Sequence, residues 1–231
     1  DITFGLDKGQ KTALIAKNGT GKTTLLRIIE GSEQADSGKI VVRNDIKISF
    51  LPQNPVFNTN LSIINAVTDF QNETSVAINE YEECINLLKN DSSEQLTKRF
   101  ELASHNMDFL NAWDYETKVK EILGKLNLSD LERKTATLSG GELKKLALAK
   151  ALLYNADILI LDEPTNHLDI DMIEWMETQL SKSETTLLIV THDRVFLDNV
   201  CSDIIELDNK QIFKYSGKYY YFLEKRAERL A

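Results

Sequence analysis

The sequence predicts an α/β fold in which a mostly parallel sheet carries covering helices, and a long helical stretch is inserted into it. Apolar runs at 11–16, 156–161 and 186–190 have the length of strands. The second and third runs are apolar throughout, which is typical of strands buried on both faces of a parallel sheet. From about 61 to 153 the apolar residues recur at steps of three and four instead, and this spacing indicates helices.

Length and composition set limits on location and partners. A chain of 231 residues with 42% hydrophobic residues can bury a core as one large domain or as a domain with a smaller subdomain. The apolar runs are too short to cross a bilayer and no signal segment is evident, so we expect no membrane partner and a cytoplasmic location. Cys84 and Cys201 lack metal-ligand spacing and are expected to be reduced and buried. The net charge of −9 argues against a general nucleic-acid clamp.

The N-terminal part is expected to contain four strands and one helix. Residues 2–6 and 11–16 are predicted strands separated by a turn, and the helix that follows them is predicted to end near Gly31. Two short alternating segments, 39–43 and 46–50, are predicted strands as well.

The inserted helical stretch contains two amphipathic helices joined by a short polar link at 90–93. A helical hairpin with coiled-coil-like packing fits their apolar stripes, and so do two packed helices of a larger bundle. Seven acids face three bases over 75–113, so we expect this hairpin to be acidic. Asp114 is expected to cap the helix that comes next. The stripes consist of Ala77, Tyr81, Cys84 and Leu88, and of Leu96, Phe100, Ala103, Met107 and Leu110.

The run AKNGTGKTT follows the first predicted buried strand and opens a segment with helical spacing. A strand that leads through a glycine-rich turn into a helix directs backbone N–H groups and a positive dipole end at one point, which suits a polyphosphate. Gly19 and Gly21 allow close approach to phosphate oxygens, Lys22 can reach the β- and γ-phosphates, and the Thr23 hydroxyl can ligate Mg²⁺. Ala16 stands where the usual pattern has glycine, and its methyl group is tolerable in an extended conformation. Taken alone, the run is also compatible with an ordinary glycine-rich turn.

Polar residues stand where the later strands end. An Asp at the carboxyl end of a buried strand can hold Mg²⁺ and a second acid beside it can orient water, which makes Asp162 and Glu163 the candidates for these roles. His192 follows the next strand and is expected at the same sheet edge, where open α/β sheets bind ligands. Gln53 also follows a strand, and in isolation it is interpreted as a surface glutamine. A hairpin over 203–207 and 211–215 and a helix from 219 are expected to complete the fold.

Ser139 and two glycines stand at the start of a further predicted helix in the run LSGGE. This arrangement suits an anion, and an ordinary helix cap explains it equally well. His105 is interpreted as a surface residue of the hairpin, and His167 as a packing or interdomain residue.

The chain resembles an ATP-binding cassette ATPase over essentially its whole length. The motifs that carry this resemblance are, in order, AKNGTGKTT, Gln53, LSGGE, ILILDEP, TNHLD and His192. DEPTNHLD with a helical insert between Gln53 and Ser139 resembles the ABC-F class, which lacks transmembrane domains and carries two cassettes in one polypeptide. FLNAWDYETKV, IEWME and FLEKRAERLA are similar to the first cassette of its Uup-like branch. The resemblance implies a P-loop NTPase core with an antiparallel β edge, plus an α-helical subdomain that carries a helical-hairpin arm.

The resemblance also implies boundaries within a single cassette. Residues 1–59 and 154–217 would form the nucleotide-binding core, and 60–153 the helical subdomain with its arm at about 75–113. Residues from 218 would begin the linker helix between two cassettes.

Nucleotide and metal binding are carried over residue by residue. The resemblance implies that Lys22 and Thr23 hold phosphate and Mg²⁺, and that Gln53 and Asp162 complete the metal shell. The implied cofactors are therefore ATP and Mg²⁺. The nucleotide-binding set from the loop comprises Lys17, Asn18, Gly19, Thr20, Gly21, Lys22, Thr23 and Thr24.

Catalysis is implied in the same way. Glu163 would be the general base or water-orienting acid, His192 would sense the γ-phosphate, and Gln53 would act with them. The segment around Ser139 would reach the nucleotide of the opposite cassette, and Asp169 would couple the two nucleotide sites. The residues implied to act in trans are Ser139, Gly140 and Gly141.

ABC-F proteins act on the ribosome, where ATP-dependent closure of two cassettes influences the tRNA, and the Uup-like branch is also connected with branched DNA. The resemblance therefore implies an ATPase that works with a second cassette or as a homodimer. An ATPase subunit of a membrane transporter is the main alternative, although such a subunit has no reason to carry a helical hairpin. A nucleic-acid-binding module clamped by ATP is a third.

Overall fold

The computed structural model describes residues 2–17, 19–68, 73–89 and 93–230. Asn18 and most of the polar link expected at 90–93 therefore lie outside the described residues. The chain forms two compact units, one of residues 1–56 with 138–231 and one of residues 57–137.

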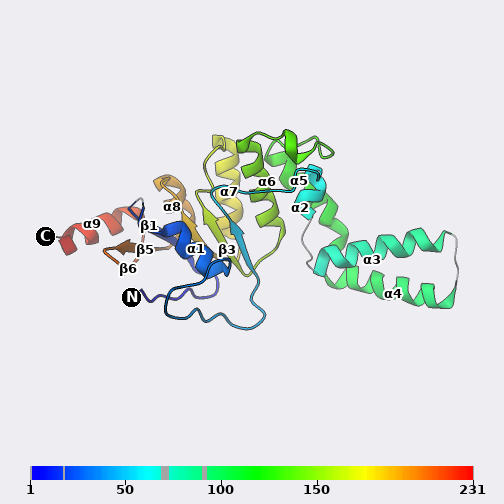
Figure 1. Ribbon diagram of the computed structural model, residues 1–231, viewed down its shortest axis with the longest axis horizontal. Coiled ribbons are helices and arrows are strands. Elements are labelled where there is room, and N and C mark those ends of the chain that lie inside the picture. Colours follow the sequence, from blue (N-terminus) through cyan, green and yellow to red (C-terminus); the bar gives the residue numbers. More distant parts are fainter. Residues whose placement is uncertain (1, 18, 69–72, 90–92, 231) are drawn as a thin grey trace. The chain divides into compact units, whose positions relative to one another are not determined.

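The first unit contains a six-stranded sheet in the order β2-β3-β4-β1-β5-β6 (Figure 1). All neighbouring strands run parallel except β5 and β6, which form the expected antiparallel edge hairpin. The strands span Lys11–Ala16 (β1), Ile48–Leu51 (β2), Ile158–Asp162 (β3), Thr186–Val190 (β4), Asp203–Asp208 (β5) and Gln211–Ser216 (β6).

The helices of the first unit lie on both faces of this sheet. The connection from β1 to β2 crosses the sheet in one direction, whereas those from β3 to β4 and from β4 to β5 run in the other. Because such crossovers are right-handed, α1 lies on the face opposite to α7 and α8 (Figure 1). The direction changes beside β1, which places a topological switch point at the carboxyl end of that strand. The helices span Lys22–Glu30 (α1), Gly140–Leu153 (α6), Ile170–Lys182 (α7), Arg194–Val200 (α8) and Tyr219–Leu230 (α9).

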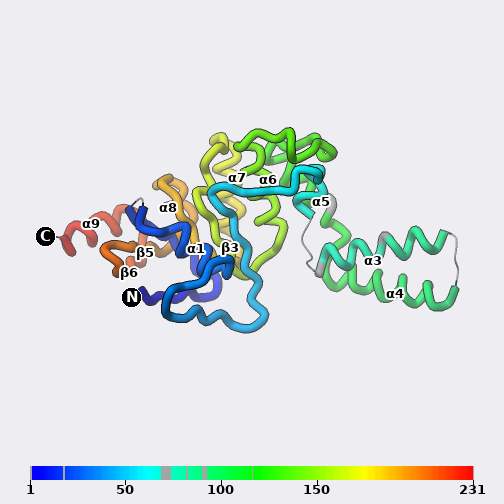
Figure 2. Tube along the Cα trace, in the orientation of Figure 1, coloured from blue at the N-terminus to red at the C-terminus, as the bar shows by residue number. Residues whose placement is uncertain are grey.

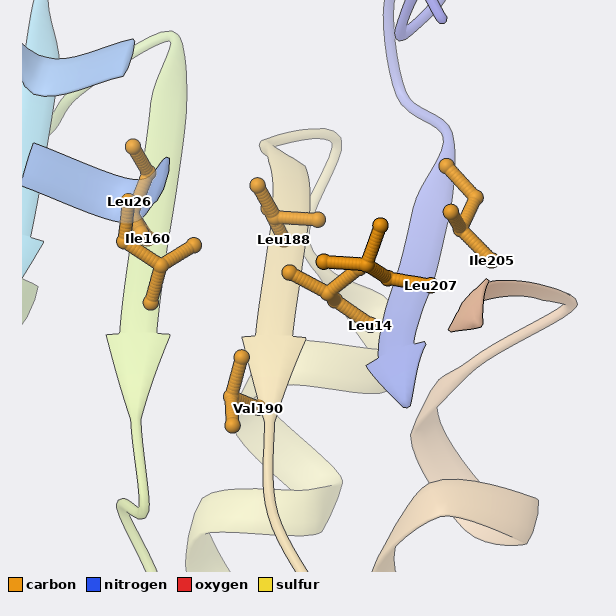
Figure 3. Close-up of a cluster of buried hydrophobic side chains, with 7 residues drawn as sticks. All are labelled: Leu14, Leu26, Ile160, Leu188, Val190, Ile205 and Leu207. Carbon is orange, nitrogen blue, oxygen red and sulfur yellow. The ribbon is translucent and has the colours of Figure 1, made fainter. Parts of the chain in front are cut away.

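A cluster of buried side chains packs α1 against four neighbouring strands. Leu26 of α1 is completely buried, and it shares the cluster with residues from β1, β3, β4 and β5 (Figure 3). This packing fixes α1 over the strands that lead to the candidate site. The cluster comprises Leu14, Leu26, Ile160, Leu188, Val190, Ile205 and Leu207.

Helix α6 belongs to the sheet unit, whereas the boundaries implied by the family resemblance grouped it with the helical part. Its apolar residues are buried along most of its length, and the Ser49 hydroxyl on β2 donates to the Ala151 carbonyl at 3.5 Å. A helix that buries this much of its surface needs a large apolar neighbour, and the sheet provides one.

Two expected strands do not form. Residues 2–6 and 39–43 have strand-like sequences, but they pair with no strand in the described part of the chain and instead line a cavity of about 1620 Å³. The alternating pattern identifies an extended segment, whereas a strand also needs a neighbour for its N–H and C=O groups. Val41 is 79% exposed as a consequence. The connection from α1 to β2 is a long coil (Figure 2).

The second unit is helical, and α3 packs beside α4 as a hairpin (Figure 2). The Tyr81 and Phe100 rings stack with centroids 5.3 Å apart. Arg99 of α4 bonds both Glu80 and Glu83 of α3. Its helices span Ile63–Thr68 (α2), Glu73–Leu88 (α3), Glu94–Phe109 (α4) and Tyr115–Lys125 (α5), with 3₁₀ turns at Ala112–Asp114 and Thr135–Thr137.

The Asp114 side chain does not cap α5, contrary to expectation. Asp114 itself ends a 3₁₀ turn, with φ −91° and ψ 5°. A capping side chain requires an extended backbone at its residue, and the 3₁₀ turn removes that conformation.

None of the helices in the described residues has the length and apolar character needed to cross a membrane. Both cysteines are free and buried, as predicted. Burial raises the pKa of the Cys201 thiol to about 12.

We expect Cys84 and Cys201 to resist a thiol reagent between pH 7 and 9 in the folded chain and to react once urea unfolds it, because attack requires an exposed thiolate. Val41→Cys provides the control, since its thiol stands at an exposed position and should react at an ordinary rate. Labelling of Cys201 as fast as of the introduced cysteine would contradict the burial described here.

Candidate active site

The glycine-rich run forms a turn between β1 and α1. Gly19 and Gly21 have φ of 78° and 88°, a region that side chains disfavour, so glycine is required at both positions. Ala16 ends β1 with an ordinary backbone, and its methyl group therefore causes no strain. Helix α1 begins at Lys22, and its first N–H groups face the turn.

Hydrogen bonds within the turn hold its charged and hydroxyl groups. The Lys22 Nζ donates to the carbonyls of Ala16 at 2.9 Å and Lys17 at 3.2 Å. The Thr20 hydroxyl donates to the same Lys17 carbonyl at 2.7 Å. Thr24 is exposed in the first turn of α1. The ammonium group of Lys22 thus lies inside the turn, beside the start of the helix.

The first acid predicted from the sequence meets this turn directly. Asp162 ends β3, is 3% exposed and accepts a hydrogen bond of 2.9 Å from the Thr23 hydroxyl of α1. Two oxygen atoms from different elements therefore stand side by side at the carboxyl edge of the sheet. Mg²⁺ prefers such oxygen ligands, so the pair fits this ion.

The second acid has an unusual backbone. Glu163 has φ 53°, which costs a residue with a side chain about 1–3 kcal/mol and persists where the surroundings enforce it. Its N–H donates to the Val190 carbonyl at 2.7 Å, and its side chain is buried. Its Oε1 lies 3.4 Å from Nε2 of His192, whose side chain is 69% exposed. The ends of β3 and β4 thus present a carboxylate and an imidazole together.

Gln53 is not joined to this group within the described residues. It lies exposed on the loop after β2, two residues past Leu51, which pairs with Leu161 of β3. The strand pairing brings Gln53 to the same sheet edge as Asp162, but its side chain makes no hydrogen bond to Thr23 or Asp162 in the described part of the chain.

The remaining predicted site residues make helix caps. Ser139 caps α6 in a capping box: its hydroxyl accepts from the Glu142 N–H at 3.3 Å and donates to the Glu142 carboxylate at 2.8 Å. Asp169 caps α7 by accepting from the Met172 N–H at 3.0 Å. Ser139 and Gly140 are exposed at the start of α6, and Gly141 lies against His167.

Lys144 is a residue of this region that the sequence reasoning missed. It is 4% exposed on α6, one turn beyond Gly141, and its charge acts on Glu163 and Asp162. Burial lowers the pKa of Lys144, while the two acids raise it. Two adjacent lysines, Lys144 and Lys145, in a helix of mostly apolar residues were the available signal, but the pattern did not show which lysine faces inward.

A family model described as ABC transporter matches residues 1–166. The chain belongs to the ABC transporter family. The cassette is 40% identical over 231 residues to a Bacillus subtilis protein described as the uncharacterized ABC transporter ATP-binding protein YfmR. It is 33% identical to the Mycobacterium tuberculosis energy-dependent translational throttle protein EttA and 33% identical to the Escherichia coli ATP-binding protein Uup. These alignments cover 97–100% of the cassette and 35–41% of the relatives, so the cassette spans about two fifths of their length.

Solved structures show the same fold. An ATP-binding subunit of an ABC transporter matches with a TM-score of 0.69 at 21% identity, over 100% of the cassette and 88% of that chain. An archaeal ribosome recycling factor, aABCE1, matches with a TM-score of 0.65 at 24% identity, over 96% of the cassette and 37% of that chain. The predicted α/β fold and the resemblance to an ABC-F-type ATPase cassette are confirmed. Its place as the first of two cassettes stays a prediction.

The backbone of Glu163 leads to a test that does not depend on activity. We expect Glu163→Gly to raise the free energy of unfolding by about 0.5–1 kcal/mol, because glycine adopts positive φ without strain. Glu163→Gln keeps the strain and should lie below Glu163→Gly in urea denaturation. The reverse order of stability would show that the conformation of residue 163 is not strained.

Proposed function

We propose that this cassette binds and hydrolyses ATP as part of a cytoplasmic, ribosome-associated ABC-F protein. The observation that carries the proposal is the convergence of the phosphate loop, Asp162, Glu163 and His192 at the carboxyl ends of β1, β3 and β4. A polyphosphate binder with an acid pair and an imidazole at one edge has the groups that phosphoryl transfer to water requires.

The phosphate loop binds the substrate in this proposal. The N–H groups at the start of α1 and the Lys22 ammonium neutralise the phosphate oxygens. The Thr23 hydroxyl and the Asp162 carboxylate hold Mg²⁺ together with Gln53. When bound, Mg²⁺ supplies charge neutralisation on the phosphate oxygens. Gln53 must turn its exposed side chain towards Asp162 to take part.

Glu163 acts on the water. Its side chain is buried at the end of β3, and its carboxylate can accept a proton from a water molecule. His192 lies 3.4 Å away, where it can orient this carboxylate and donate to a γ-phosphate oxygen. Positioning and charge stabilisation supply the catalysis in this arrangement.

A second cassette completes the site. Ser139 and Gly140 are exposed at the start of α6, so they are free to approach the nucleotide of an opposing cassette or of a second copy. Asp169, at the start of α7, is placed to couple the two sites. Hydrolysis by one isolated cassette is therefore expected to be slow, even where ATP binds.

The ribosomal role is supported by relatives whose names describe a translational throttle, and the tRNA region is the proposed place of action. The α3 and α4 hairpin would be the arm. Its acidic charge favours a protein contact or recognition of shape over electrostatic binding of RNA. Branched DNA, which the resemblance to the Uup-like branch implies, is the competing target.

Glu163→Gln should retain ATP binding while hydrolysis falls at least about 100-fold, because an amide cannot accept the proton. Nucleotide affinity and phosphate release measure the two effects. The same variant, tested as the full-length protein, should sediment with ribosomes in ATP but not in ADP, and Lys22→Ala is the control that loses nucleotide binding. Undiminished hydrolysis would remove the role of Glu163, and ATP-dependent retention on branched DNA alone would replace the ribosome as target.

Ser139→Asp separates capping from action in trans. Aspartate caps helices as well as serine, but here it cannot donate to Glu142 and places a second carboxylate beside it, so stability should fall by about 1 kcal/mol, whereas a carboxylate facing a partner's phosphates should abolish hydrolysis. Ser93→Asp replaces the N-cap serine of α4, where Leu96 stands in place of a glutamate, and should leave both stability and activity nearly unchanged. Turnover per cassette that is independent of protein concentration and insensitive to Ser139→Asp would contradict a shared site.

A further inference from the structure

A cluster of charged side chains joins the phosphate loop to α9 at the other side of β1. Two acids of β5, Glu206 and Asp208, form its centre. Glu206 is 2% exposed and pairs in register with Ile15, the penultimate residue of β1. Asp208 follows two residues later, beside the point where β1 passes into the phosphate loop. These acids therefore stand close to the region that binds polyphosphate in the proposed function.

Two arginines of α9 contact the acids. The Nη2 of Arg229 donates to Glu206 at 2.9 Å and to Asp208 at 3.5 Å, and its guanidinium stacks 3.5 Å from the centroid of the Phe213 ring. The Nε of Arg226 lies 2.6 Å from Glu206 in an ion pair, without hydrogen-bond geometry. A carboxylate as buried as Glu206 requires such partners, so α9 is held on the sheet by charge as well as by packing.

Asp208 is shared between α9 and the phosphate loop. Its Oδ2 accepts from Arg229, and its Oδ1 lies 3.8 Å from the Nζ of Lys17. Asp208 has 13% of its side chain exposed, whereas Lys17 has 72%. The lysine is thus free to move towards an anion, while the aspartate is held in place. A negative charge fixed at this point opposes the approach of a polyphosphate and competes with it for Lys17.

We propose that Asp208 is a positioning residue for the phosphate loop and that Arg229 of α9 sets the affinity of that loop for nucleotide. The proposal rests on nucleotide binding as proposed above. When Arg229 is docked, its charge offsets that of Asp208 and Lys17 is available to phosphate. When α9 leaves the sheet, the full charge of Asp208 acts on Lys17 and on the anion, and binding weakens.

The coupling acts in both directions, as linkage requires. A polyphosphate that draws Lys17 away leaves Asp208 to Arg229 alone, so nucleotide binding strengthens the docking of α9. Any segment that continues from α9 would thereby receive a signal from the phosphate loop of its own cassette. The signal is independent of Ser139 and of a second cassette.

ATP dissociation constants test the proposal in the full-length protein, with single-site measurements at this cassette. Asp208→Asn should bind about threefold to tenfold more tightly than wild type, and Arg229→Met weaker by a similar factor. Arg229→Lys keeps the charge and should restore most of the affinity. Arg226→Met is the matched control, because Arg226 holds α9 through Glu206 without contacting Asp208.

Two further readouts separate charge from structure. In the Asp208→Asn background Arg229→Met should have no effect on affinity, and the gain from Asp208→Asn should shrink between 50 and 500 mM salt, roughly the range over which screening becomes strong. ATP should slow hydrogen exchange of the backbone amides in 219–230 in wild type but not in Asp208→Asn.

Several outcomes would overturn the proposal. One is that Asp208→Asn binds ATP no more tightly than wild type. Another is that Arg226→Met weakens ATP binding as much as Arg229→Met. A third is that Arg229→Met weakens binding equally in the Asp208→Asn background. If the wild-type protein binds ATP and the variants give these results, only the role proposed for Asp208 and Arg229 is refuted. If the wild-type protein binds no ATP at this cassette, the proposed function is refuted as well.

Discussion

Parallel pairing of β1 with β4, and of β4 with β3, determines where Asp162, Glu163 and His192 lie relative to the phosphate loop. The register aligns Asp162 with Val190, and the Glu163 N–H then bonds the Val190 carbonyl. Because the carboxyl ends of parallel strands open on one edge, groups more than a hundred residues apart in sequence meet within hydrogen-bond distance. A slip of this register by one residue would turn Asp162 to the other face of the sheet and separate it from Thr23.

The elements that the sequence predicted well are those whose side chains alone decide the structure. The continuous apolar runs predicted β3 and β4 correctly. The turn between β1 and α1 was predictable because its positive φ angles are adopted readily by glycine and by few other residue types. The strand predicted at 39–43 does not form, because an alternating pattern indicates an extended segment and does not show whether a neighbouring strand is available to pair with it. The cap expected from Asp114 does not form because a 3₁₀ turn includes this residue and gives it a non-extended backbone.

The site was predictable in its residue types and only partly in its contacts. Asp162 and Thr23 meet as their positions at a strand end and a helix start require. The pattern along the sequence does not identify the partners of Lys144 or Asp208, since those partners come from other elements and depend on register and helix rotation. The positive φ of Glu163 was not predictable either, because strand pairing in the sheet determines the backbone conformation of this residue.

The capping box of α6 has a consequence for the proposed contact of Ser139 with the nucleotide of a second cassette. A serine hydroxyl has one proton, and that of Ser139 is already donated to the Glu142 carboxylate. Before it can be donated to an oxygen of a neighbouring molecule, this local bond must break, so contact across an interface competes with a bond inside the helix. In the proposed contact, the residue at position 142 therefore sets the cost of releasing the Ser139 hydroxyl, and a side chain there that cannot accept a hydrogen bond would lower that cost.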